Sequence, residues 1–274
     1  MKWQIATIRN IVELSRRVKS FSLELEYPSS NIVPGQYYDV RLSSEDGYIT
    51  ERSYSITSSP NNGNFIDLTI TKSIDGEVSW YFHNNISEGD KVEIRGPIGN
   101  YFNWKPGFCE RVIFFAGGTG ISPFMSMIRH KVEIQDPTQF TLLYSVREEE
   151  DILFRSELYN YAKTDPQFLI NITLTKNSND TWKGREGRFS SKQIMEILGE
   201  SKSKTVNYIC GPTSFVEELS KNKLFPNVSG IKFLKHDGGC GGTHKYAKVL
   251  CDLLAGYCLL YTSDAADDTP CVDI

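Results

Sequence analysis

Short stretches of alternating apolar and polar residues fill the first hundred positions of the chain. Such alternation is typical of strands that bury one face. Six stretches are also rich in β-branched and aromatic residues, at positions 3–11, 18–27, 35–42, 53–58, 64–73 and 90–96. Turn-forming pairs such as Pro34–Gly35 and Asn62–Gly63 separate them, and one short helix is expected near residues 79–85. The pattern predicts an antiparallel Greek-key β-barrel over residues 1–106.

The pattern changes at about residue 107, where near-continuous apolar runs replace the alternation. Such runs are typical of strands that are buried on both faces of a parallel sheet. They lie at positions 111–116, 140–146, 168–175, 206–210 and 230–235. Helical stretches follow them at 122–134, 150–163, 190–200 and 213–223. Strands alternating with helices predict a five-stranded parallel α/β sheet over residues 107–235, whose ligands bind beyond the carboxyl ends of the strands.

Residues 236–274 fit neither pattern. Their apolar stretch is short and interrupted. Four of the six cysteines of the chain fall within residues 236–274, at irregular spacings. We expect this tail to be either an artefact of the reading frame or a genuine surface helix with a disordered end. We assign it no function.

Charge and cysteine usage exclude several classes of protein. The 274 residues carry a formal net charge of −4, whereas a dedicated nucleic-acid-binding protein has a basic surface. No apolar run reaches the roughly 18 residues of a membrane span, and charges interrupt the first twenty positions, where a signal peptide is apolar. The cysteines lack the spacings of zinc and plant-type iron–sulfur sites. We therefore expect a soluble cytoplasmic protein that binds no nucleic acid and no metal.

A glycine-rich turn follows the first buried strand of the second half. Gly118, Thr119 and Gly120 lie between this strand and a helix that opens near Ser122–Pro123. Glycines allow a ligand to approach the backbone closely, and a helix N-terminus favours an anion such as a diphosphate. The segment is a candidate phosphate site, although a glycine-rich turn in any α/β unit has the same appearance.

Basic residues near the next strand bear on which dinucleotide would bind. Ser145 and Arg147 follow that strand, and an arginine there suits a 2′-phosphate better than a ribose hydroxyl. Arg185 and Arg188 are candidates to complete the anion site. The residue types favour NADPH over NADH. NADH stays the alternative, because Glu148, Glu149 and Glu150 follow directly after Arg147 and would repel a phosphate.

Cys210 and Gly211 end the fourth strand of the second half and are followed by a proline. Their position predicts that they lie beside the glycine-rich turn. An inert buried thiol is the ordinary alternative for Cys210.

Two segments of the first half offer groups for a planar anionic ligand. Arg52, Tyr54 and Ser55 supply a cation, a flat aromatic face and a short hydroxyl within one strand. Gly76, Val78 and Ser79 begin the expected short helix and form a second candidate phosphate cradle. The ordinary alternative is an edge strand with a surface arginine.

The order of these motifs resembles the ferredoxin–NADP⁺ reductase superfamily over about residues 5–235. The matching segments are PGQYYDV (34–40), RSYSITSSP (52–60), GEVSWYFHN (76–84), GPIGNYF (96–102), AGGTGISPF (116–124), LLYSVREEEDILFRSEL (142–158), GREGRF (184–189) and YICGP (208–212). The resemblance implies a flavin domain over residues 1–106 and a nucleotide domain over residues 107–235.

The resemblance also implies FAD as cofactor and NAD(P)H as electron donor. Ser55 and Cys210 would be the catalytic positions, because Ser55 would reach the flavin N5 edge and Cys210 would lie near the nicotinamide. The implied flavin-binding residues are Arg52, Ser53, Tyr54, Ser55, Thr69, Ile70, Thr71, Gly76, Val78 and Ser79. The implied nucleotide-binding residues are Gly118, Thr119, Gly120, Ser145, Arg147, Arg185, Arg188, Cys210 and Gly211.

By this resemblance the chain passes electrons from NADPH through FAD to a separate acceptor, such as a ferredoxin, a flavodoxin or an oxygenase component. Two alternatives remain open: an NADH-dependent reductase component serving a dioxygenase or a haem protein, and a non-catalytic flavin-binding subunit that relays electrons. The chain departs from the family at its last strand, where GIKFLKHDGGC lacks the usual acidic and aromatic residues near the flavin.

Overall fold

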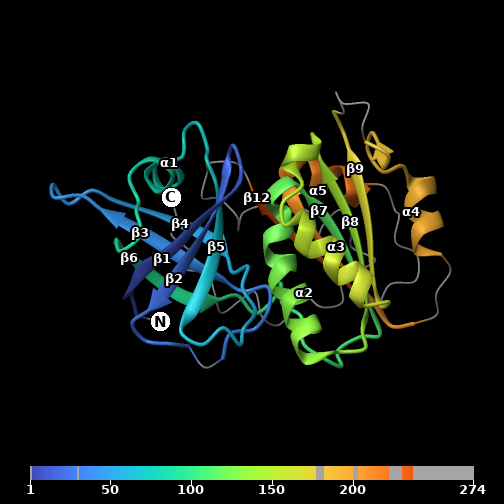
Figure 1. Ribbon diagram of the computed structural model, residues 1–274, viewed down its shortest axis with the longest axis horizontal. Helices are drawn as coiled ribbons and strands as arrows, with labels where there is room; N and C mark the ends of the chain where they lie inside the picture. Colours follow the sequence, from blue (N-terminus) through green and yellow to red (C-terminus); the bar gives the residue numbers. More distant parts are fainter. Residues whose placement is uncertain (1, 30, 177–181, 200–202, 222–229, 237–274) are drawn as a thin grey trace, which may run out of the picture.

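The computed structural model describes residues 2–29, 31–176, 182–199, 203–221 and 230–236. It contains two sheets that lie side by side, an antiparallel one formed by the first half of the chain and a parallel one formed by the second (Figure 1). The tail singled out above lies outside the described residues, apart from His236.

The antiparallel sheet has six strands in the order β4-β3-β6-β1-β2-β5. Their bounds are β1 (Gln4–Ser15), β2 (Val18–Leu25), β3 (Tyr37–Ser43), β4 (Ile49–Ser55), β5 (Phe65–Thr71) and β6 (Lys91–Ile98). A bridge between Ile56 and Leu68 joins the end of β4 to β5, so the sheet curls into a barrel. Alternate side chains from these strands, such as Phe21, Tyr38 and Ile94, fill its interior. The predicted antiparallel barrel is confirmed, although β4 begins earlier than expected.

One helix, α1 (Glu77–Asn84), packs on the barrel beside β3, β4 and β5. Val78 and Phe82 are both fully buried and point into the barrel core. The ring of Phe82 meets that of Phe21 edge to face, with 5.0 Å between centroids. The Phe82 ring also lies 6.5 Å from that of Tyr54, which places α1 beside the strand that carries Arg52 and Tyr54.

The second sheet is wholly parallel, in the order β10-β9-β8-β7-β11-β12. Its strands are β7 (Arg111–Gly117), β8 (Gln139–Val146), β9 (Phe168–Leu174), β10 (Arg185–Glu186), β11 (Thr205–Pro212) and β12 (Gly230–His236). Every residue of β7 is buried, as its apolar run predicts. The five predicted strands are confirmed, and the sequence prediction missed the sixth, because the two residues of β10 are too short for a periodic pattern.

Helices cover both faces of this sheet. α2 (Ser122–Ile134) and α3 (Arg155–Thr164) pack on one face, and α4 (Ser191–Leu198) and α5 (Thr213–Lys221) on the other (Figure 1). α2 has its predicted bounds. α3 begins five residues later than predicted, because Glu148 and Asp151 form a capping box around the short turn η2 (Glu149–Asp151) and Phe154 then adopts a left-handed conformation, with φ of 56°.

The segment between the two sheets packs against the parallel sheet. Phe102 and Trp104 lie in the core beneath α2, where Trp104 meets Phe140 edge to face. The carbonyl oxygen of Asn103 accepts hydrogen bonds from the Tyr208 hydroxyl at 2.6 Å and from the Lys232 ammonium at 3.0 Å. The connection is therefore held by aromatic packing and by two donors on neighbouring strands.

Candidate active site

The strand β4 presents Arg52 and Tyr54 on one face of the barrel. It pairs with β3 alone, because it ends the strand order of the sheet. Tyr54 is half-buried, and its ring lies 6.5 Å from that of Phe82 on α1. Burial raises the pKa of the Tyr54 phenol, although the nearby Arg52 charge acts to lower it. The phenol is therefore neutral at physiological pH, as a stacking surface for a planar ring requires.

The other residues of β4 point differently. The Ser53 hydroxyl donates to Asp39 at 2.6 Å, and Asp39 also accepts from Arg95, so Ser53 faces away from Tyr54. Ser55 is half-buried and is the last residue of the strand. The predicted roles of Ser53 and Ser55 stay predictions.

The start of α1 has the geometry of an anion cradle. A β-carbon at Gly76 would lie 2.5 Å from the Ser79 hydroxyl oxygen and 2.8 Å from Cβ of Ser73, so a larger residue there would displace the two serine side chains. The Ser79 hydroxyl donates to the Gly76 carbonyl and accepts from the Ser73 amide, which holds the loop closed on the helix. No side chain caps α1 at this end. Its first-turn amides therefore remain available to an anion.

A hollow of about 400 Å³ adjoins this cradle. Its lining comes from β3, from the loop before α1 and from α1 itself, namely Leu42, Ile74, Asp75, Gly76, Glu77, Trp80 and Tyr81. Sequence analysis missed Trp80 and Tyr81, although a tryptophan left half exposed on a short helix is a usable signal for a binding surface.

The predicted adenosine-side residues Thr69, Ile70 and Thr71 lie on β5. Ile70 is buried in the barrel core, and its carbonyl oxygen is hydrogen-bonded to Nε2 of His83 at 2.9 Å. This partner reduces what the backbone of Ile70 offers to a ligand. Thr71 is half-buried and Thr69 is buried.

The glycine-rich turn after β7 forms the short 3₁₀ turn η1 (Gly118–Ile121), which leads directly into α2. A β-carbon at Gly120 would lie 2.2 Å from the carbonyl oxygen of Cys210 and 2.7 Å from the amide nitrogen of Gly211. Gly118 has φ of 54°, a conformation that disfavours other residues. The turn after β7 and the end of β11 are thus in backbone contact, as predicted. Thr119 is half-buried and lies within the turn itself.

The register of the parallel sheet aligns further candidates. Gly117 pairs with Ser145, Ser145 with Thr173, and Thr173 with Arg185, so one row crosses four strands at their carboxyl ends. Thr173 was not predicted, since its role depends on a register that only the folded sheet defines. A row of this kind is where open α/β sheets bind their ligands.

The side chains around the expected 2′-phosphate site differ in their partners. Arg147 is exposed, and its guanidinium makes no ion pair in the described part of the chain. Glu148 takes part in the capping box, and Glu149 pairs with Arg155 at 2.6 Å, so these two carboxylates are engaged locally. Arg188 pairs with Glu218 of α5 at 2.6 Å. Arg147 is thus better placed for a phosphate than Arg188.

Cys210 is buried, and its side chain packs in the core cluster that contains α2. Burial raises the pKa of its thiol far above the ordinary value, so no thiolate forms at physiological pH. The contact of Cys210 with the turn after β7 runs through its backbone carbonyl. The structure therefore supports a role in shaping the site rather than in acid–base chemistry.

The residues of both halves fit the cofactors that the resemblance implies. A β-carbon at Gly76 or Gly120 would collide with neighbouring protein atoms, so these two glycines let adjoining segments pack closely, and the uncapped N-terminus of α1 and the turn before α2 are separate candidate anion sites. Among the described residues, no group of three or more His, Cys, Asp or Glu side chains is arranged to hold a metal ion. None of the described helices has the length and apolar character to cross a membrane.

Comparison with family models identifies both halves. The oxidoreductase FAD-binding domain matches residues 6–103, and the oxidoreductase NAD-binding domain matches residues 114–221. The chain belongs to the ferredoxin–NADP⁺ reductase-like superfamily. This member is an NAD(P)H-dependent FAD oxidoreductase. The exact bounds that we predicted for its two domains stay predictions.

Curated relatives of this reductase include fungal and bacterial proteins. It is 27% identical to NADH-cytochrome b5 reductase 2 of Aspergillus terreus, over 83% of this chain and 72% of that protein. It is 31% identical to the plasma membrane-associated coenzyme Q6 reductase of Saccharomyces cerevisiae, over 74% and 64%. It is 30% identical to a glycine betaine monooxygenase reductase subunit of Pseudomonas aeruginosa, over 68% of this chain and only 50% of that protein.

Solved structures share the fold. The cytochrome b5 reductase domain of Ulva prolifera nitrate reductase superposes with a TM-score of 0.75 at 23% identity, covering 85% of this chain and 97% of that one. The FAD/NAD-binding domain of a Vibrio cholerae nitric oxide dioxygenase gives 0.73 at 21% identity, covering 85% and 98%.

Proposed function

We propose that this reductase takes electrons from NADPH and passes them through FAD to a separate one-electron acceptor protein. FAD accepts a pair of electrons as hydride and can release them singly, which is the chemistry such a conversion needs. The protein supplies positions and electrostatics. The observation that carries the proposal is the backbone contact of Gly120 with Cys210, which brings the glycine-rich turn after β7 and the end of β11 together at the carboxyl edge of the parallel sheet. The proposed nicotinamide slot lies at this edge.

The residues have separate tasks in this proposal. Arg52 and the first turn of α1 hold the diphosphate of FAD, while Tyr54 packs on the isoalloxazine and Ser55 contacts its N5 edge. Thr119 and Gly120 admit the nicotinamide against the flavin, and Ser145 with Arg147 receives the adenosine end of the nucleotide. Cys210 limits the depth of the slot.

The choice of NADPH rests on Arg147, which is exposed and makes no ion pair within the described residues. NADH is the second candidate, and the names of the relatives favour it, because they include NADH-cytochrome b5 reductases. The same names support a haem protein or an oxygenase component as the acceptor, beside the ferredoxin or flavodoxin expected from the sequence.

Anaerobic absorbance spectra test this function. The purified chain is expected to show an oxidised flavin spectrum that bleaches on addition of NADPH, and faster than with NADH at equal concentration. Re-oxidation by cytochrome b5, ferredoxin and flavodoxin, each added in turn, then ranks the acceptors. A yellow protein that neither nucleotide bleaches would instead support a non-catalytic flavin-binding subunit.

We also propose a cytoplasmic location. Cys109 and Cys210 are buried free thiols in the part of the chain that the structure describes, as is usual in a reducing compartment. Fractionation of cells with an antibody to the chain tests this proposal, and recovery with the membrane or secreted fraction contradicts it.

A further inference from the structure

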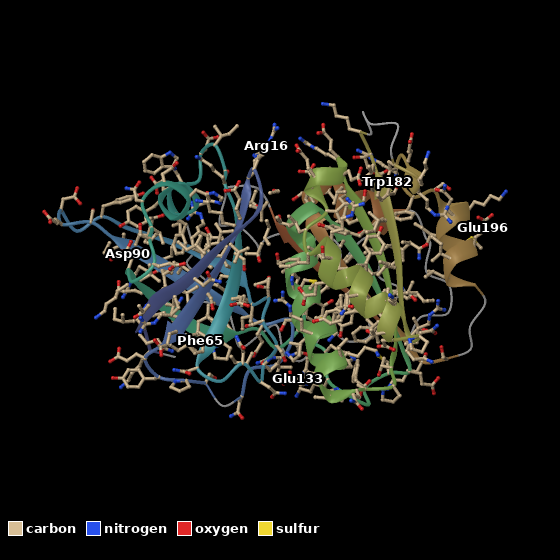
Figure 2. All side chains as sticks on the ribbon, viewed as in Figure 1. Arg16, Phe65, Asp90, Glu133, Trp182 and Glu196 are labelled. Carbon is tan, nitrogen blue, oxygen red and sulfur yellow. The ribbon has the colours of Figure 1, made fainter. Side chains whose placement is uncertain are left out.

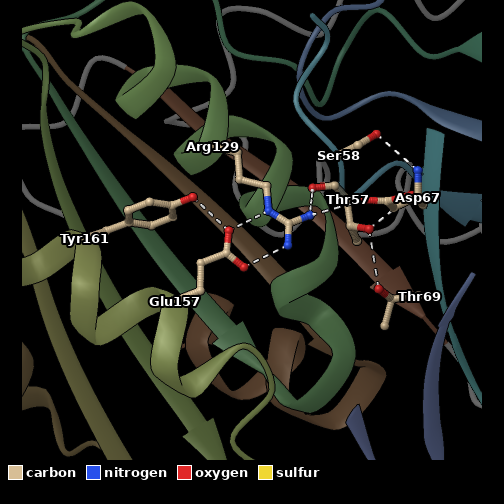
Figure 3. A network of polar contacts seen from close by, with 7 residues as sticks. All are labelled: Thr57, Ser58, Asp67, Thr69, Arg129, Glu157 and Tyr161. Carbon is tan, nitrogen blue, oxygen red and sulfur yellow. Dashed lines mark hydrogen bonds and ion pairs between the residues drawn. The ribbon is translucent and has the colours of Figure 1, made fainter. Parts of the chain in front are cut away.

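Arg129 lies near the middle of α2 and contacts both halves of the molecule (Figure 3). Its Nε and Nη2 donate to the two carboxylate oxygens of Glu157 on α3, at 2.7 and 2.8 Å. Its Nη1 donates to the carbonyl oxygen of Thr57 in the barrel at 2.7 Å and lies 3.8 Å from the Asp67 carboxylate. One guanidinium therefore uses three nitrogens to join α2, α3 and the barrel.

The barrel segment that Arg129 holds is itself firmly fixed. The amide and the hydroxyl of Thr57 both donate to the carbonyl oxygen of Asp67, at 2.9 and 3.0 Å. The Asp67 amide donates in return to the Ser58 hydroxyl at 3.1 Å. These bonds fasten the segment after β4 to β5, so a bond to the Thr57 carbonyl is a bond to the barrel as a whole.

A second contact follows along α2. The Ser59 hydroxyl hydrogen-bonds to the Glu133 carboxylate, one helical turn beyond Arg129. Glu133 lies at the lower end of the domain interface (Figure 2). The two contacts bind the same face of α2 to the same barrel segment, which restricts rotation of the helix as well as translation.

Both elements joined by Arg129 lead to the proposed site. Thr57 lies two residues after Ser55, and α2 begins two residues after Gly120. A helix transmits a displacement along its length because its backbone is hydrogen-bonded throughout. Any shift of the Arg129–Thr57 contact would therefore move the nucleotide turn relative to the flavin strand.

We propose that Arg129 is a positioning residue that sets the distance between flavin and nicotinamide by holding the Thr57 carbonyl. This inference rests on the function proposed above, since it assigns to Arg129 the geometry of that hydride transfer. In this proposal Arg129 contacts neither cofactor directly. Burial acts to lower the pKa of the guanidinium, but the hydrogen bonds and charge of Glu157 and the charge of Asp67 raise it overall, so Arg129 stays charged.

The test compares three variants. Arg129→Lys keeps a positive charge, but a single ammonium cannot span Glu157 and Thr57 together. Glu157→Gln breaks the charge pair inside the nucleotide half and leaves the bond from Arg129 to Thr57. Arg41→Gln is the matched control, because Arg41 makes a bidentate pair with Glu93 inside the barrel alone, at 3.0 and 2.9 Å.

Stopped-flow flavin reduction at saturating nucleotide gives the first readout. Arg129→Lys is expected to slow it about tenfold or more, because small misplacements of reacting groups reduce rates steeply. Its FAD content and its re-oxidation by ferricyanide should match the wild type. Glu157→Gln and Arg41→Gln should stay within about twofold of the wild-type rate.

Hydrogen exchange of residues 56–60 gives a second readout that needs no nucleotide. Arg129→Lys is expected to raise exchange there, and Glu157→Gln is not. An unchanged reduction rate in Arg129→Lys overturns the proposal. A rate that falls equally in Glu157→Gln also overturns it, because the network would then act within the nucleotide half alone. If neither nucleotide reduces the wild-type protein, the proposed function fails. Equal hydrogen exchange in the wild type and in Arg129→Lys overturns the proposed link between the domains, whatever the reduction rates are. Should Arg129→Lys not fold, the charge-neutral pair Arg129→Gln with Glu157→Gln takes its place in both measurements.

Discussion

Gly120 stands against the carbonyl oxygen of Cys210 so closely that a β-carbon would lie 2.2 Å from it. No real side-chain atom is tolerated at that distance, and the neighbour is backbone, which cannot turn aside. The contact joins the turn after β7 to the end of β11 and defines the floor of the proposed nicotinamide slot.

Gly120→Ala should therefore separate the two turns and slow flavin reduction by NAD(P)H at least tenfold, because the nicotinamide would no longer stack at its proper distance. FAD should remain bound, since its proposed ligands lie in the barrel. Stopped-flow reduction and the flavin spectrum measure the two effects. Gly63→Ala is the control, because a β-carbon at Gly63 meets nothing within 4 Å, so that variant bears only the local strain of its positive φ of 67°. Equal rates in Gly120→Ala and wild type would falsify the slot.

Arg52→Ala should weaken FAD binding without unfolding the barrel. A charge-assisted hydrogen bond to a phosphate contributes about 1.5–3 kcal/mol, so the Kd for FAD should rise about 10- to 100-fold. Fluorescence titration of the deflavinated protein measures this change. The conservative variant Arg52→Lys should recover part of the affinity. Full retention of FAD by the alanine variant would remove Arg52 from the cradle.

Arg147→Ala should raise KM for NADPH about tenfold and leave KM for NADH unchanged, because only the 2′-phosphate would contact the guanidinium. FAD content should not change. Steady-state kinetics with ferricyanide and each nucleotide measure the effect. Arg155→Ala serves as the control, since Arg155 pairs with Glu149 in the same region. A parallel rise of KM for both nucleotides contradicts the assignment.

Lys232→Met should stabilise the protein at neutral pH. Burial lowers the pKa of Lys232 from 10.5 to about 8. The unfolded chain thus binds more protons than the folded one between these values, and stability rises with pH across that window. Below pH 8 the full cost, about 3 kcal/mol, is present. The variant loses one hydrogen bond to Asn103, about 1 kcal/mol, but Tyr208 still donates there.

Thermal unfolding followed from pH 7 to pH 10.5 checks this prediction. The gain in Tm of Lys232→Met over wild type should be several degrees at pH 7 and should vanish toward pH 10.5. Lys204→Met is the comparison, because the ammonium groups of Lys204 and Lys232 both lie over the Phe108 ring, at 5.0 and 5.5 Å from its centroid, but Lys204 is exposed. A gain that is independent of pH would mean that apolar packing, not the buried charge, is responsible.

The elements with long periodic patterns could be predicted from the sequence. α2 was placed at its observed bounds, because Pro123 suits the first turn of a helix and because the apolar residues that follow keep a helical spacing. β7 was recognised by an uninterrupted apolar run. The position of Cys210 at the end of the fourth predicted strand of the second half predicts that it lies beside the glycine-rich turn, and the register shows that β7 and β11 are paired.

Contacts between distant residues could not be predicted. Nothing in the local pattern links Arg129 to Thr57, which lies 72 positions earlier, or Arg188 to Glu218. The row from Gly117 to Arg185 depends on strand order and register, and β10 carries only two residues of signal. Side-chain orientation within β4 was equally hidden, since Ser53 finds its partner Asp39 on a neighbouring strand.

The aromatic connection described above affects how the two halves could be separated. Phe102 and Trp104 belong by chain position to the end of the barrel but by packing to the core beneath α2. A fragment that ended after them would expose both rings to water, and the complementary fragment would be left with a void where they had been. A cut after Trp104 therefore destabilises both fragments. A cut before Phe102 keeps both rings in the same fragment as α2, against which they pack.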